Sequence, residues 1–298
     1  MSAPPTDKIT FSRRERVAGY VALTKPRIIE LLLVTTVPTM FVAERSVPSV
    51  WLMVATVVGG TLAAGGANAV NMVIDRDIDG LMERTMHRPL VRGVMSPRAA
   101  LTFAVVIEVV AFAWLFTTVN LLSALLAVSA TFFYVFVYTL WLKRTTTQNI
   151  VIGGAAGAVP VLVGWSAVTN SLGWAPVVLF LVIFFWTPPH FWALAIRYRE
   201  DYSAASVPML PAVATLAATA RKITLYTVML VGTTLVFAPV ADMGAVYVAA
   251  ALILGALFGV LALAVQRDPT ERAAMRLFSY SITYVTLLFA AMIVDVLV

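Results

Sequence analysis

The sequence predicts an all-α polytopic membrane protein with nine transmembrane helices. Of its 298 residues, 61% are hydrophobic and only 12% are charged, whereas about 25% of the residues are charged in a typical soluble domain. The apolar residues form nine long runs, and about 20 residues suffice to cross the hydrocarbon core of a bilayer. Both observations argue against a soluble domain. The sequence has no cysteine, which excludes a disulfide framework and a thiolate metal site.

Residues 1–26 precede the first apolar run and are polar and basic. We expect residues 1–10 to be disordered, residues 11–23 to form a short amphipathic helix on the membrane surface, and no cleaved signal peptide to be present. Residues 27–298 form a single transmembrane domain, because no soluble linker interrupts the apolar runs. The predicted spans are residues 28–43, 50–74, 99–119, 121–142, 150–168, 174–196, 223–240, 244–265 and 277–298.

The basic residues indicate how these spans are oriented. With the N-terminus on the cytoplasmic side, every Lys and Arg except Arg45 lies on that side, as the positive-inside rule predicts. The C-terminus is then external, and we expect the chain to lie in the lipid bilayer of the cell inner (plasma) membrane. Because the positive charges follow this topology, the formal net charge of +6 does not indicate nucleic-acid binding.

Two carboxylates interrupt otherwise apolar spans. Glu30 lies about one turn past Arg27, so it is either solvated at the inner interface or part of a cavity wall. Glu108 lies nearer the middle of its span, where an unpaired charge is costly. We therefore expect Glu108 to lie inside the helix bundle.

A row of polar side chains marks the inner end of the second span. Asn71, Asp75 and Asp79 are spaced i, i+4 and i+8, so on a helix they share one face, whereas Asp77 points elsewhere. Such a row of oxygen ligands suits Mg²⁺ held between protein carboxylates and substrate phosphates. The pattern predicts an enzyme that ionises a lipid diphosphate at the membrane surface.

Basic residues follow these acids closely. Arg84 and Arg88 lie on the next inner connection, and guanidinium groups bind diphosphate oxygens in bidentate fashion. Lys143 and Arg144, at the end of the fourth span, are either a phosphate clamp or plain positive-inside anchors. For the acids and for Arg84 and Arg88, the alternative is an ordinary inner loop with solvated charges. The placement of the acids on one helical face favours a binding site instead.

The sixth span and the connection after it contribute a third cluster. Pro188 and Pro189 remove backbone donors and kink a helix, as occurs where a helix lines a cavity. His190 is then either a ligand contact or a satisfied interior histidine. Asp201 offers a second acid site, and two acid sites can close on one diphosphate through two bridging metal ions.

These motifs resemble those of the protoheme IX farnesyltransferases, the heme O synthases among the UbiA-type intramembrane prenyltransferases. The likeness covers essentially the whole chain after about residue 20. The matching stretches are Lys-Pro-Arg at 25–27, the Asn71–Asp75–Asp79 pattern, Arg-Thr-x-x-Arg-Pro-Leu at 84–90, Tyr-Thr…Leu-Lys-Arg at 138–144, Thr-Pro-Pro-His-Phe-Trp at 187–192 and Val-Pro-Met-Leu-Pro at 207–211.

The resemblance implies nine helices around a central cavity, farnesyl diphosphate as the donor, and heme B as the acceptor rather than as a cofactor. It further implies Mg²⁺, with two ions, and heme O as the product. A heme A synthase or a terminal oxidase would be a partner. The implied ligands are Asn71, Asp75, Asp79 and Asp201 for metal, Arg84, Arg88, Lys143 and Arg144 for diphosphate, and His190 and Trp186 for heme.

The sequence departs from the wider superfamily at two positions. Ala205 stands where a second aspartate commonly follows Asp201 four residues on, and Glu200 is a possible substitute. Tyr138 and Lys143 are five residues apart, whereas the superfamily often has a Tyr and a Lys four apart. These departures leave open the ligands of the second metal ion and the role of Tyr138.

The mechanism expected from charge is ionisation of the diphosphate to an allylic farnesyl cation, held by aromatic faces in a cavity that excludes water. The nearest rival is a prenyltransferase of the same superfamily acting on an aromatic quinone precursor. A rival of another class is a membrane transporter, which would leave the one-sided acid face unexplained. Candidate cavity aromatics are Phe184, Phe185, Trp186, Phe191 and Trp192.

Overall fold

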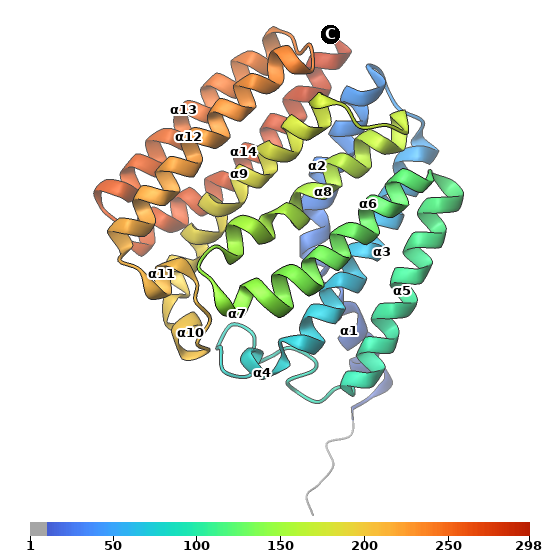
Figure 1. Ribbon diagram of the computed structural model, residues 1–298, viewed down its shortest axis with the longest axis vertical. Helices are drawn as coiled ribbons and strands as arrows, with labels where there is room; N and C mark the ends of the chain where they lie inside the picture. Colours follow the sequence, from blue (N-terminus) through green and yellow to red (C-terminus); the bar gives the residue numbers. More distant parts are fainter. Residues whose placement is uncertain (1–10) are drawn as a thin grey trace, which may run out of the picture.

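A computed structural model describes residues 11–298 of the chain, except for the side chains of residues 27–33. Every regular element in this part is a helix, and the long helices run roughly alongside one another (Figure 1), so the predicted all-α fold is confirmed. The helices are α1 (Arg13–Leu23), α2 (Pro26–Glu44), α3 (Val50–Ile74), α4 (Arg76–Asp79), α5 (Pro97–Thr118), α6 (Leu121–Phe132), η1 (Phe133–Leu142), α7 (Lys143–Thr145), α8 (Asn149–Thr169), α9 (Trp174–Arg197), α10 (Arg199–Ala204), α11 (Leu210–Val213), α12 (Leu216–Val240), α13 (Ala245–Arg267) and α14 (Glu271–Leu297).

Eight helices in the described residues are long and apolar enough to cross a membrane. They are α3, α5, the continuous helix Leu121–Thr145, α8, α9, α12, α13 and α14. Helix α2 covers the first predicted span, but the side chains of residues 27–33, with Glu30 among them, lie outside the described part. The count of nine spans therefore stays a prediction.

Three helices begin before their predicted spans because capping side chains set their first turns. Ser96, Thr215 and Thr270 each accept a hydrogen bond from the backbone N–H three residues on, at the starts of α5, α12 and α14. These bonds satisfy amides that lack an intrahelical partner. The first two turns of these helices carry charged residues, so the helices extend beyond the apolar runs.

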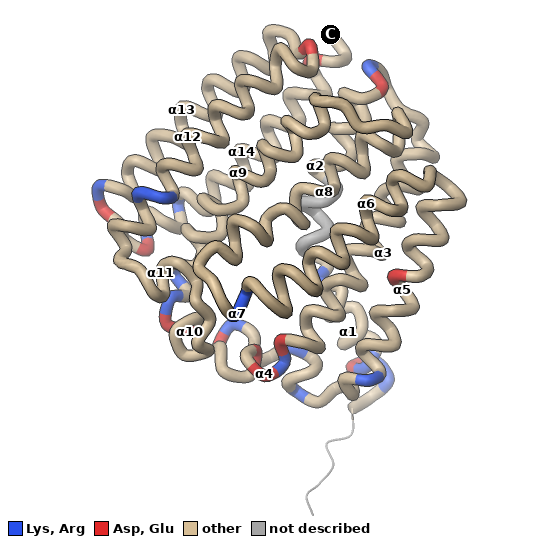
Figure 2. Tube along the Cα trace, viewed as in Figure 1, with Lys and Arg blue, Asp and Glu red and all other residues tan. Residues whose placement is uncertain are grey.

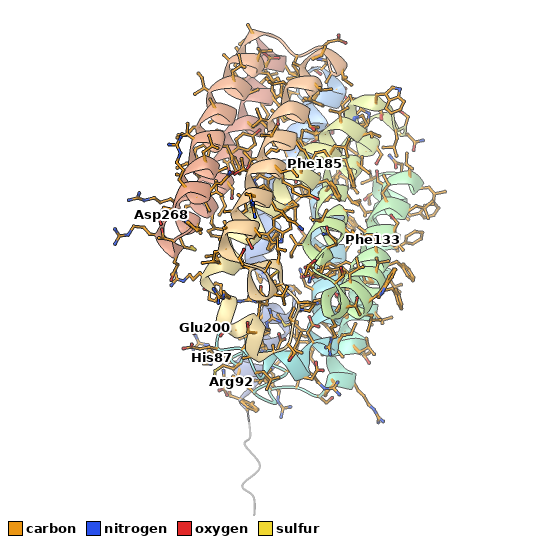
Figure 3. All side chains as sticks on the ribbon, turned by 60° about the vertical axis from the view of Figure 1, so that its left-hand side comes forward. His87, Arg92, Phe133, Phe185, Glu200 and Asp268 are labelled. Atoms are coloured by element: carbon orange, nitrogen blue, oxygen red, sulfur yellow. The ribbon has the colours of Figure 1, made fainter. Side chains whose placement is uncertain are left out.

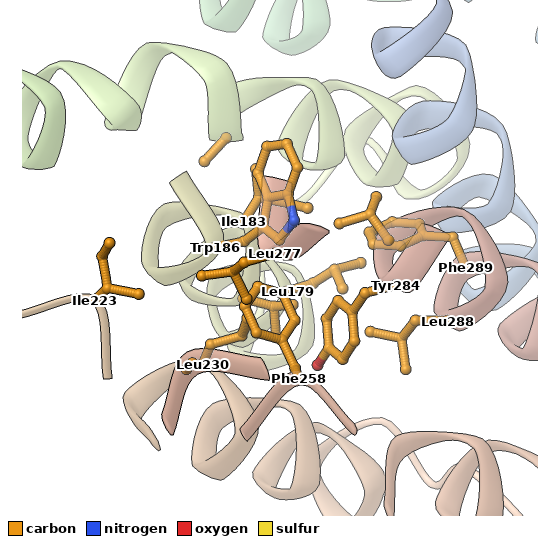
Figure 4. Packing of buried hydrophobic residues seen from close by; sticks show 14 of the residues in the cluster. Leu179, Ile183, Trp186, Ile223, Leu230, Phe258, Leu277, Tyr284, Leu288 and Phe289 are labelled. Atoms are coloured by element: carbon orange, nitrogen blue, oxygen red, sulfur yellow. The ribbon is translucent and has the colours of Figure 1, made fainter. Parts of the chain in front are cut away.

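The largest core cluster joins α9, α12, α13 and α14. Figure 4 shows Trp186 of α9 packed near Tyr284 of α14 and Phe258 of α13. The Phe258 and Tyr284 rings meet edge to face with centroids 5.1 Å apart, a favourable aromatic geometry. Helices α3, α5, α6 and α8 make the other half of the bundle, in which α3 packs on α5 and α8 packs on α6 and α2.

Charged residues gather at the end of the bundle that carries α1, α4, α7 and α10 (Figure 2). Few lie at the opposite end. Arg45, which was predicted to be the exception among the basic residues, lies at that end. Its guanidinium, after α2, is 3.8 Å from the carboxylate of Asp242, which lies between α12 and α13. The charged residues thus gather at the end that was predicted to be the inner side.

Glu108 lies where α5 meets α3 and α6, as expected for a carboxylate inside the bundle. Its Oε1 accepts a hydrogen bond of 3.0 Å from the Thr131 hydroxyl. The same side chain packs against Gly66, where an added Cβ would come within 2.6 Å of it. A neighbouring helix thus supplies the partner that a carboxylate needs within an apolar span.

Gly164→Ala is expected to lower the apparent melting temperature of the protein in detergent. A Cβ on Gly164 of α8 would lie 2.6 Å from the backbone oxygen of Thr36 in α2. Backbone cannot rotate away, so the two helices would have to separate, at a cost of about 1–3 kcal/mol. Gly157→Ala, on the same helix, is the matched control because a Cβ there meets nothing within 4 Å. Equal melting temperatures for the two variants would contradict this account of the α2–α8 contact.

Candidate active site

Three of the four predicted metal ligands, Asn71, Asp75 and Asp79, share one face where α3 ends and α4 begins. Asp75 separates the two helices, yet its N–H donates to Asn71 O at 2.9 Å and the Asp79 N–H donates to Asp75 O at 2.8 Å. Helical spacing therefore continues across the junction. The side chains of Asn71, Asp75 and Asp79 are buried, whereas the side chain of Asp77 is 60% exposed and points elsewhere.

Basic residues from other segments neutralise the buried acids. The Asp75 carboxylate pairs with Lys143 and lies 3.5 Å from Arg144. The Asp79 carboxylate binds Nη1 of Arg88 through both oxygens, at 2.6 and 2.7 Å. Buried carboxylates without such partners would be strongly destabilising. The site thus already holds the cations that a diphosphate would need.

Arg144 hydrogen-bonds Asp77 at the surface, and its Nη2 also lies 3.5 Å from Asp75 Oδ1. Its guanidinium donates two hydrogen bonds of 2.8 Å to the Asp77 carboxylate. These bonds are the main reason why the pKa of Asp77 falls to about 2. Arg144 does not line the central cavity. Its predicted contact with diphosphate therefore stays a prediction, and the geometry gives it an anchoring role at the loop.

Lys25 belongs to the site, although sequence reasoning did not assign it a role. Its backbone is left-handed, with a φ of 51°, at the residue before Pro26. The turn directs Nζ to the amide oxygen of Asn71, 3.1 Å away. Burial, together with the cations Arg88 and Lys143, lowers the pKa of Lys25 to about 7. The only signal for it in the sequence was the Lys-Pro-Arg match at 25–27.

A central cavity of about 430 Å³ opens beside these groups. One end is charged, and the remainder is lined by small residues, threonines and a few aromatic rings, which suits a long apolar chain with an anionic head. The charged end is lined by Lys25, Asn71, Asp79, Arg84, Arg88 and Lys143. The small residues include Gly60, Ala63, Ala64, Ala67, Gly153 and Gly157.

The fourth span changes helix type beside the cavity. Residues Phe133–Leu142 form a π-helix, η1, and the Lys143 N–H donates to the carbonyl of Tyr138, five residues earlier. In an α-helix residues five apart are roughly 140° out of line, whereas i→i+5 hydrogen bonds bring them together. Tyr138 and Lys143 therefore both line the cavity. The five-residue spacing, a departure from the superfamily pattern, is accommodated by the π-helix.

Gly153 makes room for this arrangement. A Cβ at Gly153 would lie 2.3 Å from the Tyr138 ring, and a Cβ at Gly154 would lie 2.9 Å from Thr187. The helices therefore pack closely at these two glycines. At Gly157 a Cβ would meet nothing within 4 Å, and the residue lines the cavity.

The connection after α9 comes to the same end of the molecule as the acids of α4. Oδ2 of Asp201 accepts a hydrogen bond of 3.2 Å from the Arg84 backbone N–H. The Arg84 guanidinium lies over the Tyr198 ring, 5.5 Å from its centroid. Figure 3 shows Glu200 and His87 from these two connections at this end. The two acid-bearing connections thus meet, although Asp201 itself does not line the cavity.

The donor set fits a metal ion that is completed by substrate oxygens. No cluster of three or more His, Asp or Glu side chains able to hold a metal occurs among the described residues. Asp75 Oδ1, however, is buried and accepts no hydrogen bond within the described part of the chain. Asn71 and Asp79 add further oxygens, and Mg²⁺ commonly binds one or two carboxylates together with phosphates.

Trp186 lines the cavity, whereas His190 does not. Nδ1 of His190 lies 2.6 Å from the Ser281 hydroxyl of α14, and its ring stacks on Trp186 with centroids 4.2 Å apart. This geometry favours the satisfied interior histidine. Heme contact by His190 or Trp186 stays a prediction.

Two of the five candidate aromatics, Trp186 and Phe191, reach the cavity wall. Trp192 is buried in the core, and its ring meets that of Tyr226 edge to face with centroids 5.4 Å apart. The aromatic part of the wall also includes Tyr134, Tyr138 and Tyr202.

Comparison with known proteins agrees with this architecture. The model of the UbiA prenyltransferase family matches residues 32–291. The chain belongs to the UbiA prenyltransferase family. Two relatives, both named protoheme IX farnesyltransferase, come from Frankia casuarinae and Parafrankia sp. They are 56% and 55% identical to this chain, over 95% and 93% of its length and over 99% and 90% of their own.

Solved structures of UbiA-type proteins share the fold. A digeranylgeranylglyceryl phosphate synthase superimposes with a TM-score of 0.77 at 16% identity, over 95% of this chain and 99% of its own. A UbiA homolog from Archaeoglobus fulgidus, bound to DMAPP and Mg²⁺, gives 0.63 at 15% identity, over 90% of this chain and 99% of its own. The UbiA-type fold of this chain is thereby established.

Proposed function

We propose that this chain transfers the farnesyl group of farnesyl diphosphate to a vinyl group of heme B, with addition of water, to give heme O. The observation that carries the proposal is identity above 50% over nearly the full length of relatives named protoheme IX farnesyltransferase. The cavity adds chemical support, because its cationic end and apolar remainder suit a prenyl diphosphate. Heme B is a substrate in this proposal and not a cofactor.

We assign Mg²⁺ to the acid-bearing end of the cavity, with two ions as the proposed number. When bound, the metal would neutralise charge on the departing diphosphate. Asn71, Asp75 and Asp79 would hold one ion, and Asp201 would serve the second. The Archaeoglobus fulgidus relative with Mg²⁺ and DMAPP supports metal-dependent prenyl transfer in this fold.

The protein's own cations orient the diphosphate. Lys25, Arg88 and Lys143 line the cavity and are close to the acids, so they can turn from those acids towards phosphate oxygens. Arg84 reaches the same cavity from the exposed loop. With the head group held there, the prenyl chain extends along the small residues of the cavity.

The reaction then has three bond changes. The allylic C–O bond breaks and its electron pair leaves with diphosphate. The terminal vinyl carbon of heme uses its π electrons to form the new C–C bond, which leaves a cation on the inner vinyl carbon. Water adds to that carbon and releases a proton. Trp186, Phe191 and Tyr138 line the cavity, and aromatic rings stabilise a cation while the wall excludes other water.

A competition between acceptors tests this proposal. Purified protein receives farnesyl diphosphate, Mg²⁺, and equal amounts of heme B and 4-hydroxybenzoate. We expect the farnesyl group on heme alone. Farnesylation of 4-hydroxybenzoate with heme unchanged would favour the rival quinone-precursor prenyltransferase. Movement of either compound across a vesicle membrane without consumption of farnesyl diphosphate would favour the transporter.

We further propose that the chain lies in the plasma membrane with a cytoplasmic N-terminus and an external C-terminus. The gathering of basic residues at the end that carries α4, α7 and α10 supports this orientation. A heme A synthase or a terminal oxidase is the proposed recipient of the product.

Reporter fusions test the orientation. Fusions at Gly80 and Thr145 should report a cytoplasmic position, and fusions at Ser46 and at the C-terminus should report an external one. The reason is that the first two sites lie in connections with the acids and their cations, whereas Ser46 follows Arg45 at the opposite end. An external signal at Gly80 would reverse the proposed side of the active site.

A further inference from the structure

The buried amide of Asn71 has a fixed orientation, and Thr139 is the partner that determines it. The Asn71 Nδ2 donates to Asp75 Oδ2 at 2.7 Å and to the Thr139 hydroxyl at 3.1 Å. The Asn71 Oδ1 accepts from Lys25 at 3.1 Å. The oxygen of the amide therefore faces the cavity and its nitrogen faces the helices.

The Thr139 hydroxyl acts as an acceptor towards Asn71. Its single proton is donated to the backbone carbonyl of Tyr134 at 2.8 Å, five residues earlier in η1. A hydroxyl has one donor and two acceptor positions, so only lone pairs remain for Asn71. The side chain is fully buried, and water has no access to replace it.

The other two partners of Asn71 are charged groups that the proposed substrate would engage. Asp75 is a proposed metal ligand, and Lys25 lines the cavity where diphosphate would lie. Both would turn towards those charges when metal and diphosphate bind. Thr139 carries no charge and is held by η1, so its contact with Asn71 remains.

We propose that Thr139 is a positioning residue, which keeps the amide oxygen of Asn71 turned towards the metal site. This inference rests on the proposed Mg²⁺–diphosphate site. A metal ion binds the oxygen of an amide and not its NH₂ group, so a rotated Asn71 would lose a ligand. Thr139 and Lys143 are four residues apart and share a side of the helix, and the π-helix adds Tyr138 to the cavity beside Lys143.

Thr139→Val and Thr139→Ser test this role. Valine keeps the shape of threonine and lacks the hydroxyl, whereas serine keeps the hydroxyl. The readout is Mn²⁺ binding in the presence of inorganic pyrophosphate, followed by electron paramagnetic resonance on detergent-solubilised protein. We expect binding to be roughly three- to tenfold weaker in Thr139→Val, the range of one lost hydrogen bond, and within about twofold of the unaltered protein in Thr139→Ser.

A second background separates positioning from general loss of structure. In Asn71→Asp the side chain has no NH₂ group to orient, so adding Thr139→Val should weaken binding less than about twofold. If Thr139→Val does not accumulate, Thr139→Cys replaces it, because a thiol is a weak acceptor. A full loss in the Asn71→Asp background, or unchanged binding in Thr139→Val, would overturn the role of Thr139 alone. Absence of Mn²⁺–pyrophosphate binding in the unaltered protein would overturn the proposed metal site and this inference with it.

Discussion

Asp75→Asn is expected to lower farnesyl transfer at least about a thousandfold. The Asp75 carboxylate is fully buried, pairs with Lys143, and has one oxygen that accepts no hydrogen bond among the described residues. That oxygen, Oδ1, lies 3.5 Å from the Arg144 guanidinium and is the carboxylate oxygen that we assign to the metal. Asparagine keeps the shape of the side chain but loses its charge, so the metal would be held too weakly to neutralise the leaving diphosphate. The measurement is turnover of farnesyl diphosphate by purified protein in detergent.

Asp77→Asn is the matched control, because Asp77 is two residues away and exposed. It should lose less activity, since its carboxylate only anchors Arg144 at the surface. Equal losses in the two variants would show that the proposed ligand set is wrong.

The stability of Asp75→Asn needs its own check, because Lys143 would lose a buried partner. The melting temperatures of Asp75→Asn and of the unaltered protein are therefore compared at the temperature range of the assay. We expect Asp75→Asn to stay folded at the assay temperature and still to lack turnover. Unfolding at that temperature would mean that the loss of turnover reflects the stability of the protein.

Removal of Mg²⁺ is the second change with a large expected effect, and transfer should stop. At the charged end of the cavity, Lys25, Arg84, Arg88 and Lys143 supply four positive charges, and Asp79, with Asp75 behind it, supplies two negative ones. At most two net positive charges remain, which is too little for a diphosphate. Without metal, the buried carboxylates would repel the substrate.

Chelation followed by return of the metal measures this effect. Turnover should vanish with chelator and return with excess Mg²⁺, and Mn²⁺ should replace Mg²⁺ because it binds the same oxygen ligands. Undiminished turnover after complete chelation would mean that the protein's cations alone stabilise the leaving group.

The helices and the acid face were predictable because both depend on local sequence patterns. Apolar runs determine the spans, and the four-residue spacing of Asn71, Asp75 and Asp79 survives a break in the helix at Asp75. The starts of α12 and α14 were predicted too late, because the apolar runs begin only after the charged residues, whereas Thr215 and Thr270 cap the helices before those residues.

The π-helix could not be predicted from local patterns. Nothing in the residues 133–142 marks a wider turn. The observed contacts that accompany it come from other helices: Thr139 receives a hydrogen bond from Asn71 of α3, and Tyr138 fills the space left by Gly153 of α8. The five-residue spacing of Tyr138 and Lys143 was visible in the sequence as a difference from the superfamily pattern. Only the structure shows that a π-helix places both residues at the cavity.

Ion pairing across connections was equally hidden from the sequence. Lys143 and Arg144 are adjacent, yet Lys143 lines the cavity and pairs with Asp75, whereas Arg144 pairs with Asp77 at the surface. Lys25 joins the site from 46 residues before Asn71 through a left-handed turn. Periodicity within one helix carries no information about such partners.

Mass analysis of heme after incubation with farnesyl diphosphate and Mg²⁺ tests the central claim most directly. Heme B should become heavier by a farnesyl group and a hydroxyl group, and in water enriched in ¹⁸O the hydroxyl should carry the label. The Asp75→Asn variant, treated identically, should leave heme B unchanged. The proposed function would be contradicted if folded, metal-loaded protein left heme B unaltered. It would also be contradicted if farnesyl transfer to heme took up no oxygen from water.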